Sequence, residues 1–448
     1  MPLPQRLTIY PGHPLRGSYT LPGDKSLSHR AALFAALAQG ESRIEHFLTA
    51  GVTRAMLEAL TALGVPWDLQ GEVLAVHSGG LSAWQAPKQP LDCGNSATSL
   101  RLLAGALAAS GLPAVLDGTP GLRRRPMERI LQPLQQMGVP IQAAAGSNAP
   151  LILQPRSPNQ PLLPIQYHLP VASAQVKSCL LLAGLAARRP STLLEPGLSR
   201  DHTERMLHAM GVHVESGFEH GKYITHIIPP SPLCLRPLNI ALPGDFSAAA
   251  FLIIAALITP GSEVQLCNVG LNPTRTGLLE ALQRMGAKIK ITPQPDQGTE
   301  PMGDLSVRYS RLKSTDISGE QVVRMIDEFP AFAIAALFAE GESVISQAEE
   351  LRYKESDRIG ALVCELNKLG IQASENPAGF NILGGRLPEG GEVDAHGDHR
   401  LAMALALIGL AGQGPVTIRD AQIIAESFPE FPNVLRSLGA EVSQEPEP

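Results

Sequence analysis

The chain repeats one short phrase, Leu-x-x-[Leu/Met]-Gly, six times along its 448 residues. The copies are 74, 73, 75, 84 and 69 residues apart, and their glycines are Gly64, Gly138, Gly211, Gly286, Gly370 and Gly439. Each glycine follows an amphipathic stretch and precedes a short β-like run, which is typical of a helix that ends on a left-handed glycine and leads into a strand. The six copies predict a fold that repeats one structural unit.

A second helix is expected in each repeat, ahead of the glycine-capped one. These stretches are rich in Ala and Leu on nearly all sides, which indicates helices that are buried all round. They are Ser26–Ala38, Ala97–Ala109, Ala174–Ala187, Ser247–Ile258, Phe329–Ala339 and His399–Leu410. A β-like run lies between the two helices, two strands follow the capped helix, and one strand leads in. Each repeat therefore reads βαβαββ.

The two ends of the sequence are expected to complete each other. The sixth repeat ends before its last strand, and an extra strand, Leu7–Tyr10, precedes the first repeat. The tetrapeptide Leu-Pro-Gly-Asp occurs at 21–24 and again at 242–245, where the chain would cross between halves. The prediction is an α/β fold of two inside-out domains, each of three βαβαββ repeats with helices buried and strands outside. The domains are residues 22–242, and residues 1–21 together with 243–448.

Composition excludes several classes of protein. The net charge of −6 gives no electrostatic reason to expect nucleic acid or an anionic membrane as a partner. The five cysteines show no CxxC pairing, so neither a disulfide framework nor a zinc site is expected. We see no targeting segment and no apolar run near the roughly 18 residues of a membrane span. We expect a cytoplasmic protein without a metal, and a monomer, because the repeats close each domain on itself.

Charged phrases stand at the N-termini of the buried helices. Lys25, Arg30 and Arg400 are the most informative, because the helix dipole disfavours cations at this end unless an anion holds them there. Ser, Asp and Asn in the same phrases have an ordinary alternative role as N-caps. His29 and His399 are expected to be packing groups rather than ligands or bases. The pattern predicts a multiply anionic ligand in a cleft between the domains.

A second group of charges lies near the starts of the capped helices. Residues 123–125 are three consecutive arginines, which fit either a binding site or a solvated loop. Glu355 stands between Lys354 and Arg358, so it is a candidate general acid–base, although a surface ion-pair network is the alternative. Prolines 126 and 273 are expected at first helical positions.

Taken together, these phrases resemble the enolpyruvyl transferase family, in its branch that acts on shikimate 3-phosphate. The resemblance covers about residues 5–440. It rests on LPGDKSLSHR (21–30), GNSAT (94–98), RPM (125–127), SAQVKS (173–178), SRDHTE (199–204), GDFS (244–247), NPTRTG (272–277), DEFP (327–330), LRYKESDRI (351–359), GDHRLAM (397–403) and SFPEF (427–431). It implies transfer of the enolpyruvyl group of phosphoenolpyruvate to the 5-hydroxyl of shikimate 3-phosphate, on the route to chorismate and the aromatic amino acids. No metal or organic cofactor is implied.

The resemblance also implies roles for individual residues. Asp327 is implied as the base for the 5-hydroxyl and Glu355 as the acid that delivers and then removes the methyl proton, with Lys25 as the third catalytic residue. The implied shikimate 3-phosphate ligands are Lys25, Ser26, Arg30, Ser173, Ala174, Gln175, Arg200, Asp327 and Lys354. The implied phosphoenolpyruvate ligands are Lys25, Asn95, Ala97, Arg125, Gln175, Arg358 and Arg400.

Some positions depart from the family pattern. Many members carry acidic residues near Ala50, Gly51 and Val52, and some have Lys where Glu426 stands. Ala97 stands where many members have glycine. Because its added methyl group could exclude bulkier analogues of the small substrate, we predict that glyphosate inhibits the enzyme poorly. Two other functions remain open. One is the related transfer of enolpyruvyl to UDP-N-acetylglucosamine. Two features argue against it, namely that residues 117–126 contain no Cys and that Ser26 follows Lys25. The other is a non-catalytic binder of shikimate phosphate.

Overall fold

The fold was examined in a computed structural model that describes residues 5–144, 146–157, 160–295 and 299–445. Within these residues the chain forms two compact units. The continuous unit consists of residues 23–242 with 299 and 300, and the split unit consists of residues 5–22, 243–295 and 301–445. The predicted outer boundaries, residues 1 and 448, lie outside the described residues, and the predicted domain division stays a prediction. No helix in the described ranges combines the length and apolar character needed to span a membrane.

The six glycine-capped helices are present, as predicted. They are α2 (Gly51–Ala62), α5 (Glu128–Gln136), α7 (His202–Ala209), α9 (Gly277–Arg284), α12 (Arg358–Lys368) and α14 (Phe431–Ser437). All six cap glycines have φ between +77° and +110°, a region that a residue with a side chain rarely adopts. At the first copy, Val65 N donates to Leu60 O and Gly64 N to Thr61 O, the paired bonds of a Schellman cap, and the other five copies repeat this pattern.

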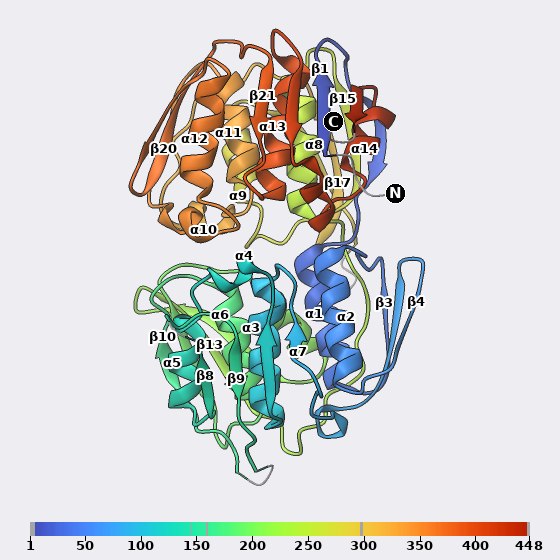
Figure 1. The fold of residues 1–448 in the computed structure, drawn as a ribbon, viewed down its shortest axis with the longest axis vertical. Helices are drawn as coiled ribbons and strands as arrows, with labels where there is room; N and C mark the ends of the chain where they lie inside the picture. Colours follow the sequence, from blue (N-terminus) through green and yellow to red (C-terminus); the bar gives the residue numbers. More distant parts are fainter. Residues whose placement is uncertain (1–4, 145, 158–159, 296–298, 446–448) are drawn as a thin grey trace. The chain divides into compact units, whose positions relative to one another are not determined.

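The six apolar helices are also confirmed. They are α1 (Lys25–Leu37), α3 (Ala97–Ser110), α6 (Ala174–Gly184), α8 (Phe246–Ile258), α11 (Phe329–Phe338) and α13 (His399–Ala411). Every residue of α8 is buried. In the split unit α8, α11 and α13 pack against one another, and in the continuous unit α3 packs against α1 and α6 (Figure 1). At Gly105 the backbones of α3 and α6 come so close that an added Cβ would lie 2.3 Å from the Cys179 carbonyl oxygen.

Three sheets surround the helices of the continuous unit. The first has the order β14-β3-β5-β4, the second β6-β7-β9-β8 and the third β10-β11-β13-β12. Their strands are β3 (Gln39–Glu45), β4 (Trp67–Gln70), β5 (Val73–Gly79), β6 (Leu91–Asp92), β7 (Ala114–Asp117), β8 (Ile141–Ala143), β9 (Leu151–Leu153), β10 (Gln166–His168), β11 (Ser191–Glu195), β12 (His213–Glu219), β13 (Lys222–Ile228) and β14 (Asn239–Ala241).

Three further sheets belong to the split unit. Their orders are β16-β17-β15-β2, β18-β20-β19 and β21-β22-β1-β23. Their strands are β1 (Arg6–Tyr10), β2 (Arg16–Thr20), β15 (Glu263–Gly270), β16 (Lys288–Pro293), β17 (Met302–Arg308), β18 (Gly341–Ile345), β19 (Gln372–Asn376), β20 (Gly379–Gly384), β21 (Gly391–Asp394), β22 (Val416–Arg419) and β23 (Glu441–Glu445). Residues along β17 alternate between more and less buried, so these sheets have one inner and one outer face. The helices are inside and the strands outside, which confirms the predicted α/β fold.

The N-terminal strand completes the sixth repeat, as predicted. Strand β1 lies between β22 and β23, with Leu7 opposite Ile418 and Ile9 opposite Val442. The sequence did not indicate the exchange of lead-in strands. Strand β2 precedes α1 in the chain but pairs with β15, while β14 precedes α8 but pairs with β3. Each of these two strands therefore stays with the unit that the chain is about to leave.

The expectation for Pro126 and Pro273 is wrong, because α5 begins at Glu128 and α9 at Gly277. Asn272 forms a tight turn in which its Oδ1 accepts from Thr274 N at 2.9 Å, so Pro273 lies in a turn ahead of the helix. Prolines do begin α4 (Pro120–Arg123), and they lie in the first turns of α11 and α14. The remaining short elements are α10 (Glu320–Arg324), η1 (Leu81–Ala83), η2 (Glu349–Tyr353) and η3 (Ala421–Glu426).

Candidate functional site

The charged phrases lie at the N-termini of the buried helices, as the sequence indicated. In the continuous unit Asp24 caps α1, Ser96 caps α3 and Ser173 caps α6, each accepting a hydrogen bond from a backbone N–H of the first turn. The ordinary capping role is therefore real for these three side chains. It also places the next residues, Lys25 and Gln175 among them, in first turns where N–H groups favour anions.

The predicted site residues divide between the two units, and each set is described within its own unit. The continuous unit holds Lys25, Ser26, Arg30, Asn95, Ala97, Arg125, Ser173, Ala174, Gln175 and Arg200. The split unit holds Asp327, Lys354, Glu355, Arg358 and Arg400.

Arg30 is a buried guanidinium fixed by three different groups. Its Nε donates to Thr203 Oγ1 at 2.9 Å, one terminal nitrogen to Ser178 Oγ at 3.1 Å and the other to the Ser26 carbonyl at 3.0 Å. Burial, together with the nearby positive charge of Arg200, lowers the pKa of Arg30 to about 10. Two arginines whose charges repel favour an anion as a common ligand.

Gln175 is oriented by its neighbours. Its amide nitrogen donates to Thr98 Oγ1 at 2.9 Å, and its amide oxygen accepts from Arg101 at 2.5 Å. Arg101 also donates to the Pro126 carbonyl at 2.8 Å. Arg101 therefore links α3, α6 and the segment that carries Arg125, a role that the sequence alone did not assign.

The two interpretations of residues 123–125, a binding site or a solvated loop, apply to different arginines. Arg123 and Arg124 are exposed, and Arg123 pairs with Asp117 at 2.5 Å, so the solvated-loop interpretation holds for them. Arg125 is partly buried, and Ala97 is buried at the first position of α3. Asn95 accepts from Thr119 Oγ1 at 3.2 Å just before the short helix α4.

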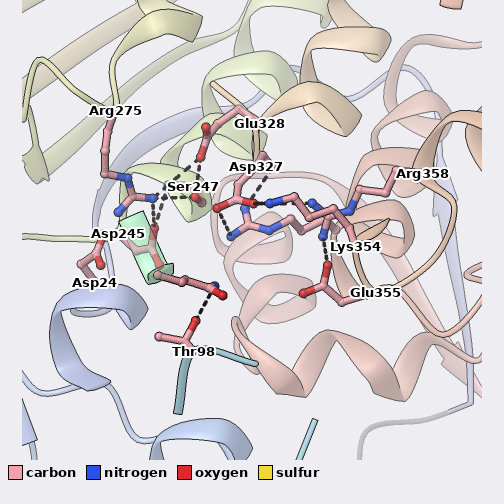
Figure 2. Close-up of polar contacts among 12 residues, drawn as sticks. Asp24, Thr98, Asp245, Ser247, Arg275, Asp327, Glu328, Lys354, Glu355 and Arg358 are labelled. Atoms are coloured by element: carbon pink, nitrogen blue, oxygen red, sulfur yellow. Dashed lines mark hydrogen bonds and ion pairs between the residues drawn. The ribbon is translucent and has the colours of Figure 1, made fainter. Parts of the chain in front are cut away.

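The split unit gathers its cations around Asp327. Lys354 Nζ lies 3.3 Å from Asp327 Oδ1, and Arg358 lies 3.6 Å from the same oxygen (Figure 2). Arg400 lies 4.0 Å from Asp327 Oδ2. Arg400 also donates to the Asp327 backbone carbonyl at 3.2 Å. Lys354 is the C-terminal cap of η2, Arg358 begins α12 and Arg400 lies in the first turn of α13. Asp327 directly precedes Glu328, the N-cap of α11.

Arg358 is the buried centre of this cluster. One terminal nitrogen lies 2.6 Å from Glu355 Oε2, and Nε lies 2.7 Å from Asp398 Oδ2. The Arg358 side chain is 1% exposed and the Asp398 side chain 0%. Burial by itself lowers the pKa of Arg358, but Asp398, Glu355 and Asp327 outweigh burial, so the pKa lies above its ordinary value. The alternative of a surface ion-pair network does not fit a guanidinium this deeply buried.

Sequence reasoning missed a second buried network in the split unit. Arg275 donates to Ser247 Oγ at 2.7 Å and lies 3.5 Å from Asp245, while Ser247 donates to Glu328, the residue after Asp327 (Figure 2). All four side chains of the network are buried. The phrases GDFS, NPTRTG and DEFP contain these residues, but nothing in their spacing indicated that the three segments meet.

His29 is a packing residue, as expected, and it predicts a pH effect on stability. Its ring is buried and Nδ1 lies 3.1 Å from Ser99 Oγ. Burial, followed by the charges of Lys25 and Arg30, lowers its pKa from 6.5 to about 3. Below about pH 6.5 the unfolded chain therefore binds a proton that the folded chain rejects, and stability falls as pH falls, by about 2 kcal/mol between pH 7 and pH 5.

Urea denaturation at pH 7 and pH 5 measures this contribution. The loss of stability between these pH values should shrink in His29→Asn. It should persist in the control His213→Asn, since the His213 side chain is 58% exposed. Equal pH dependence in wild type and His29→Asn would contradict the assignment.

The chain is similar to characterised proteins over nearly its whole length. The sequence profile of the EPSP synthase (3-phosphoshikimate 1-carboxyvinyltransferase) family matches residues 9–435. A 3-phosphoshikimate 1-carboxyvinyltransferase of Coxiella burnetii is 45% identical over 434 residues, 96% of this chain and 97% of the relative. One of Geobacter sp. (strain M21) is 43% identical over 432 residues, 96% of this chain and 98% of the relative.

Solved structures agree with the sequence relatives. The EPSP synthase of Acinetobacter baumannii superposes with a TM-score of 0.84 at 40% identity, covering 98% of this chain and 100% of the other. An enolpyruvyl transferase of Streptomyces tendae has a TM-score of 0.80 at 22% identity, over all of both chains, which supports the fold alone. The profile match over residues 9–435, the sequence identity over nearly the whole chain and the superposition agree, and this chain belongs to the EPSP synthase (3-phosphoshikimate 1-carboxyvinyltransferase) family.

Proposed function

We propose that this chain transfers the enolpyruvyl group of phosphoenolpyruvate to the 5-hydroxyl of shikimate 3-phosphate and releases phosphate. Membership of the family supports the reaction. The observation that carries the proposal is that two carboxylates, Asp327 and Glu355, are held by one buried guanidinium, that of Arg358. This arrangement supplies two acid–base groups in fixed positions, which an addition followed by an elimination requires.

In the proposed mechanism Asp327 acts once, during the addition step. Glu355 acts twice, first during the addition step and then during the elimination step. Glu355 protonates the methylene carbon of phosphoenolpyruvate, and Asp327 accepts the proton of the 5-hydroxyl as its oxygen attacks the resulting cationic carbon. Glu355 then removes a proton from the methyl group, the double bond re-forms and phosphate leaves. Lys25, Lys354 and Arg400 stabilise the charge that develops on the phosphate and carboxylate oxygens.

The proposed ligands of the substrates follow the family positions. Shikimate 3-phosphate is assigned to Lys25, Ser26, Arg30, Ser173, Ala174, Gln175, Arg200, Asp327 and Lys354. Phosphoenolpyruvate is assigned to Lys25, Asn95, Ala97, Arg125, Gln175, Arg358 and Arg400. In the split unit three cations face three carboxylates, because Asp398 joins Asp327 and Glu355. The net positive charge that attracts two anionic substrates is therefore assigned mainly to Lys25, Arg30, Arg125 and Arg200.

Phosphate release on mixing the purified protein with both substrates tests the proposal. Release that requires both substrates is expected, and omission of either gives the background. UDP-N-acetylglucosamine in place of shikimate 3-phosphate should give no release, since release would favour the related transferase. Isothermal titration separates the third case, because a non-catalytic binder would bind shikimate 3-phosphate without releasing phosphate from phosphoenolpyruvate.

Ala97 carries a prediction about inhibitor sensitivity. Ala97 is the first residue of α3, two positions after the proposed phosphoenolpyruvate ligand Asn95, and a glycine at 97 would lack the methyl group and leave more room. We expect the inhibition constant of glyphosate to be well above the KM of phosphoenolpyruvate, and Ala97→Gly to lower it by about tenfold or more, about 1.4 kcal/mol. Competition kinetics against phosphoenolpyruvate measure both values. A wild-type constant comparable to that KM would contradict the prediction.

The proposal also covers the cofactor requirement, the location and the oligomeric state that were expected from the sequence. The transfer proceeds without a metal or organic cofactor, in the cytoplasm, and the protein acts as a monomer. The departures at Val52 and Glu426 are part of the proposal too. Val52 lies in the first turn of α2 and Glu426 is the last residue of η3. Turnover by the wild-type chain tests whether the enzyme works with these two residues in place of those that other family members carry.

A further inference from the structure

The continuous unit contains a buried charge cluster that the proposed mechanism does not use. Lys177 Nζ on α6 lies 2.8 Å from Glu195 Oε2 at the end of β11 and 2.8 Å from Glu204 Oε1 on α7. The three side chains are 2%, 2% and 8% exposed. One cation between two carboxylates leaves a net negative charge. A buried cluster of this kind is weak evidence of a contribution to stability, because apolar residues of similar volume often give an equally stable protein.

Two side chains of the cluster form hydrogen bonds to backbone groups in the segments that carry proposed substrate ligands. Glu195 Oε1 accepts from the backbone N–H of Ser173 at 3.3 Å, at the start of α6. Lys177 donates to the backbone carbonyl of Ser199 at 3.4 Å, next to Arg200. Lys177 and Glu195 thus connect two segments that carry proposed ligands of shikimate 3-phosphate.

A second set of polar contacts joins the same helices to α1. Ser178, the neighbour of Lys177, shares a hydrogen bond with Thr203 at 2.6 Å, and Thr203 is the neighbour of Glu204. Arg30 donates to both hydroxyls, at 3.1 Å to Ser178 and at 2.9 Å to Thr203. The buried cluster and Arg30 therefore share the interface between α6 and α7.

The charges also complement each other. Burial lowers the pKa of Arg30 most and Arg200 lowers it further, whereas Glu204 raises it, so the Glu204 carboxylate partly offsets the repulsion between the two arginines. The cluster thus acts on the proposed ligands in two ways, through backbone contacts at Ser173 and Ser199 and through the field at Arg30.

From these contacts we infer that Lys177, with Glu195 and Glu204, is a positioning residue that holds the start of α6 and the segment around Arg200 in the geometry that binds shikimate 3-phosphate. The inference rests on the proposed function. Lys177 contacts no substrate in this role, so its loss should weaken binding of one substrate and leave the chemical step nearly unchanged.

Lys177→Met tests the inference, since Met keeps the length of the side chain and removes the charge. We expect the Kd and the KM of shikimate 3-phosphate to rise about tenfold, about 1.4 kcal/mol, while kcat and the KM of phosphoenolpyruvate change less than about twofold. Lys368→Met is the matched control, because Lys368 also pairs with a buried glutamate, Glu365 at 2.8 Å, but its side chain is 45% exposed. The control should leave all constants unchanged.

A second variant covers loss of folding in the first. Lys177→Met combined with Glu204→Gln removes one charge of each sign, and the same rise in Kd for shikimate 3-phosphate is expected. If a folded variant binds shikimate 3-phosphate as wild type does, or if kcat falls while KM is unchanged, the inference is overturned. If the wild-type protein itself does not bind shikimate 3-phosphate, the proposed function fails first, and the inference falls with it.

Discussion

Replacing Glu355 by Gln is expected to lower kcat by about 10² to 10⁴-fold, the usual contribution of a positioned general acid–base. The amide keeps the size of the side chain and a contact to Arg358, from which the carboxylate oxygen lies 2.6 Å away. It loses the ability to deliver and remove a proton. Because substrate binding depends on other residues, the KM values should change far less than kcat.

Steady-state phosphate release and isothermal titration of shikimate 3-phosphate together measure this effect. Glu375→Gln is the matched control, because Glu375 also accepts from an arginine, Arg352 at 3.0 Å, but its side chain is 50% exposed on β19. The control should retain wild-type turnover. A Glu355→Gln protein with kcat within about tenfold of wild type would remove Glu355 from the catalytic role.

Replacing Arg358 by Met should be the most destabilising of these changes. Removing one partner of a buried ion pair typically lowers the free energy of unfolding by about 3–5 kcal/mol, and Arg358 serves three carboxylates. The variant leaves Asp327, Glu355 and the fully buried Asp398 close together without the guanidinium that they share. Since the pKa of Arg358 is raised, neutral pH lies well below it and the stabilisation by the charged guanidinium is fully present there, so the loss should be visible at neutral pH.

Chemical denaturation measures the change, and an exposed pair provides the control. Arg308→Met removes a guanidinium that lies 2.7 Å from Glu263, with side chains 64% and 59% exposed, and should lower stability by less than about 1 kcal/mol. Adding Asp398→Asn to Arg358→Met should restore part of the lost stability, since one buried negative charge is removed. Similar losses in Arg358→Met and Arg308→Met would show that the cluster is not a structural centre.

The repeating part of the fold was predictable because its signals are local. A cap glycine requires only its own positive φ and two backbone bonds, and Gly64 and Gly439 both have a positive φ and the same pair of bonds. Helix α8 was predictable because every position after Ser247 is apolar. Even the long-range pairing of β1 with β22 and β23 followed, since the sixth repeat lacked one strand.

The unpredicted features depend on contacts between distant segments. Strand β2, Arg16–Thr20, has no strongly apolar pattern, and its pairing with β15 is fixed by tertiary packing. Arg275 reaches Ser247 across 28 positions of the sequence, and no spacing rule connects them. Proline 273 illustrates a further limit, because a residue suited to a helix start also suits the turn before one.

Within the candidate site, the sequence predicted which residues take part but indicated few of the contacts between them. Glu355 was expected between two cations, and its i,i+3 spacing placed it beside Arg358. Lys354 instead lies 3.3 Å from Asp327, and only the fold brings those two residues together. Asp398, read as one part of a helix-start phrase, accepts from Arg358 at 2.7 Å.

The pairing of β1 with β23 makes the natural order of this chain only one of several that could encode the same fold. Arg6 lies opposite Glu445 in that ladder, so the first and last strands are antiparallel neighbours with those residues at the same end. A circularly permuted gene that begins at residue 243, joins the old ends and finishes at residue 242 would encode the split unit ahead of residues 23–242, with residues 299 and 300 as the part of the continuous unit that still lies within it. Apart from that short excursion, the polypeptide would pass between the units once, after residue 22, and the split unit would be synthesised before the main part of the continuous unit.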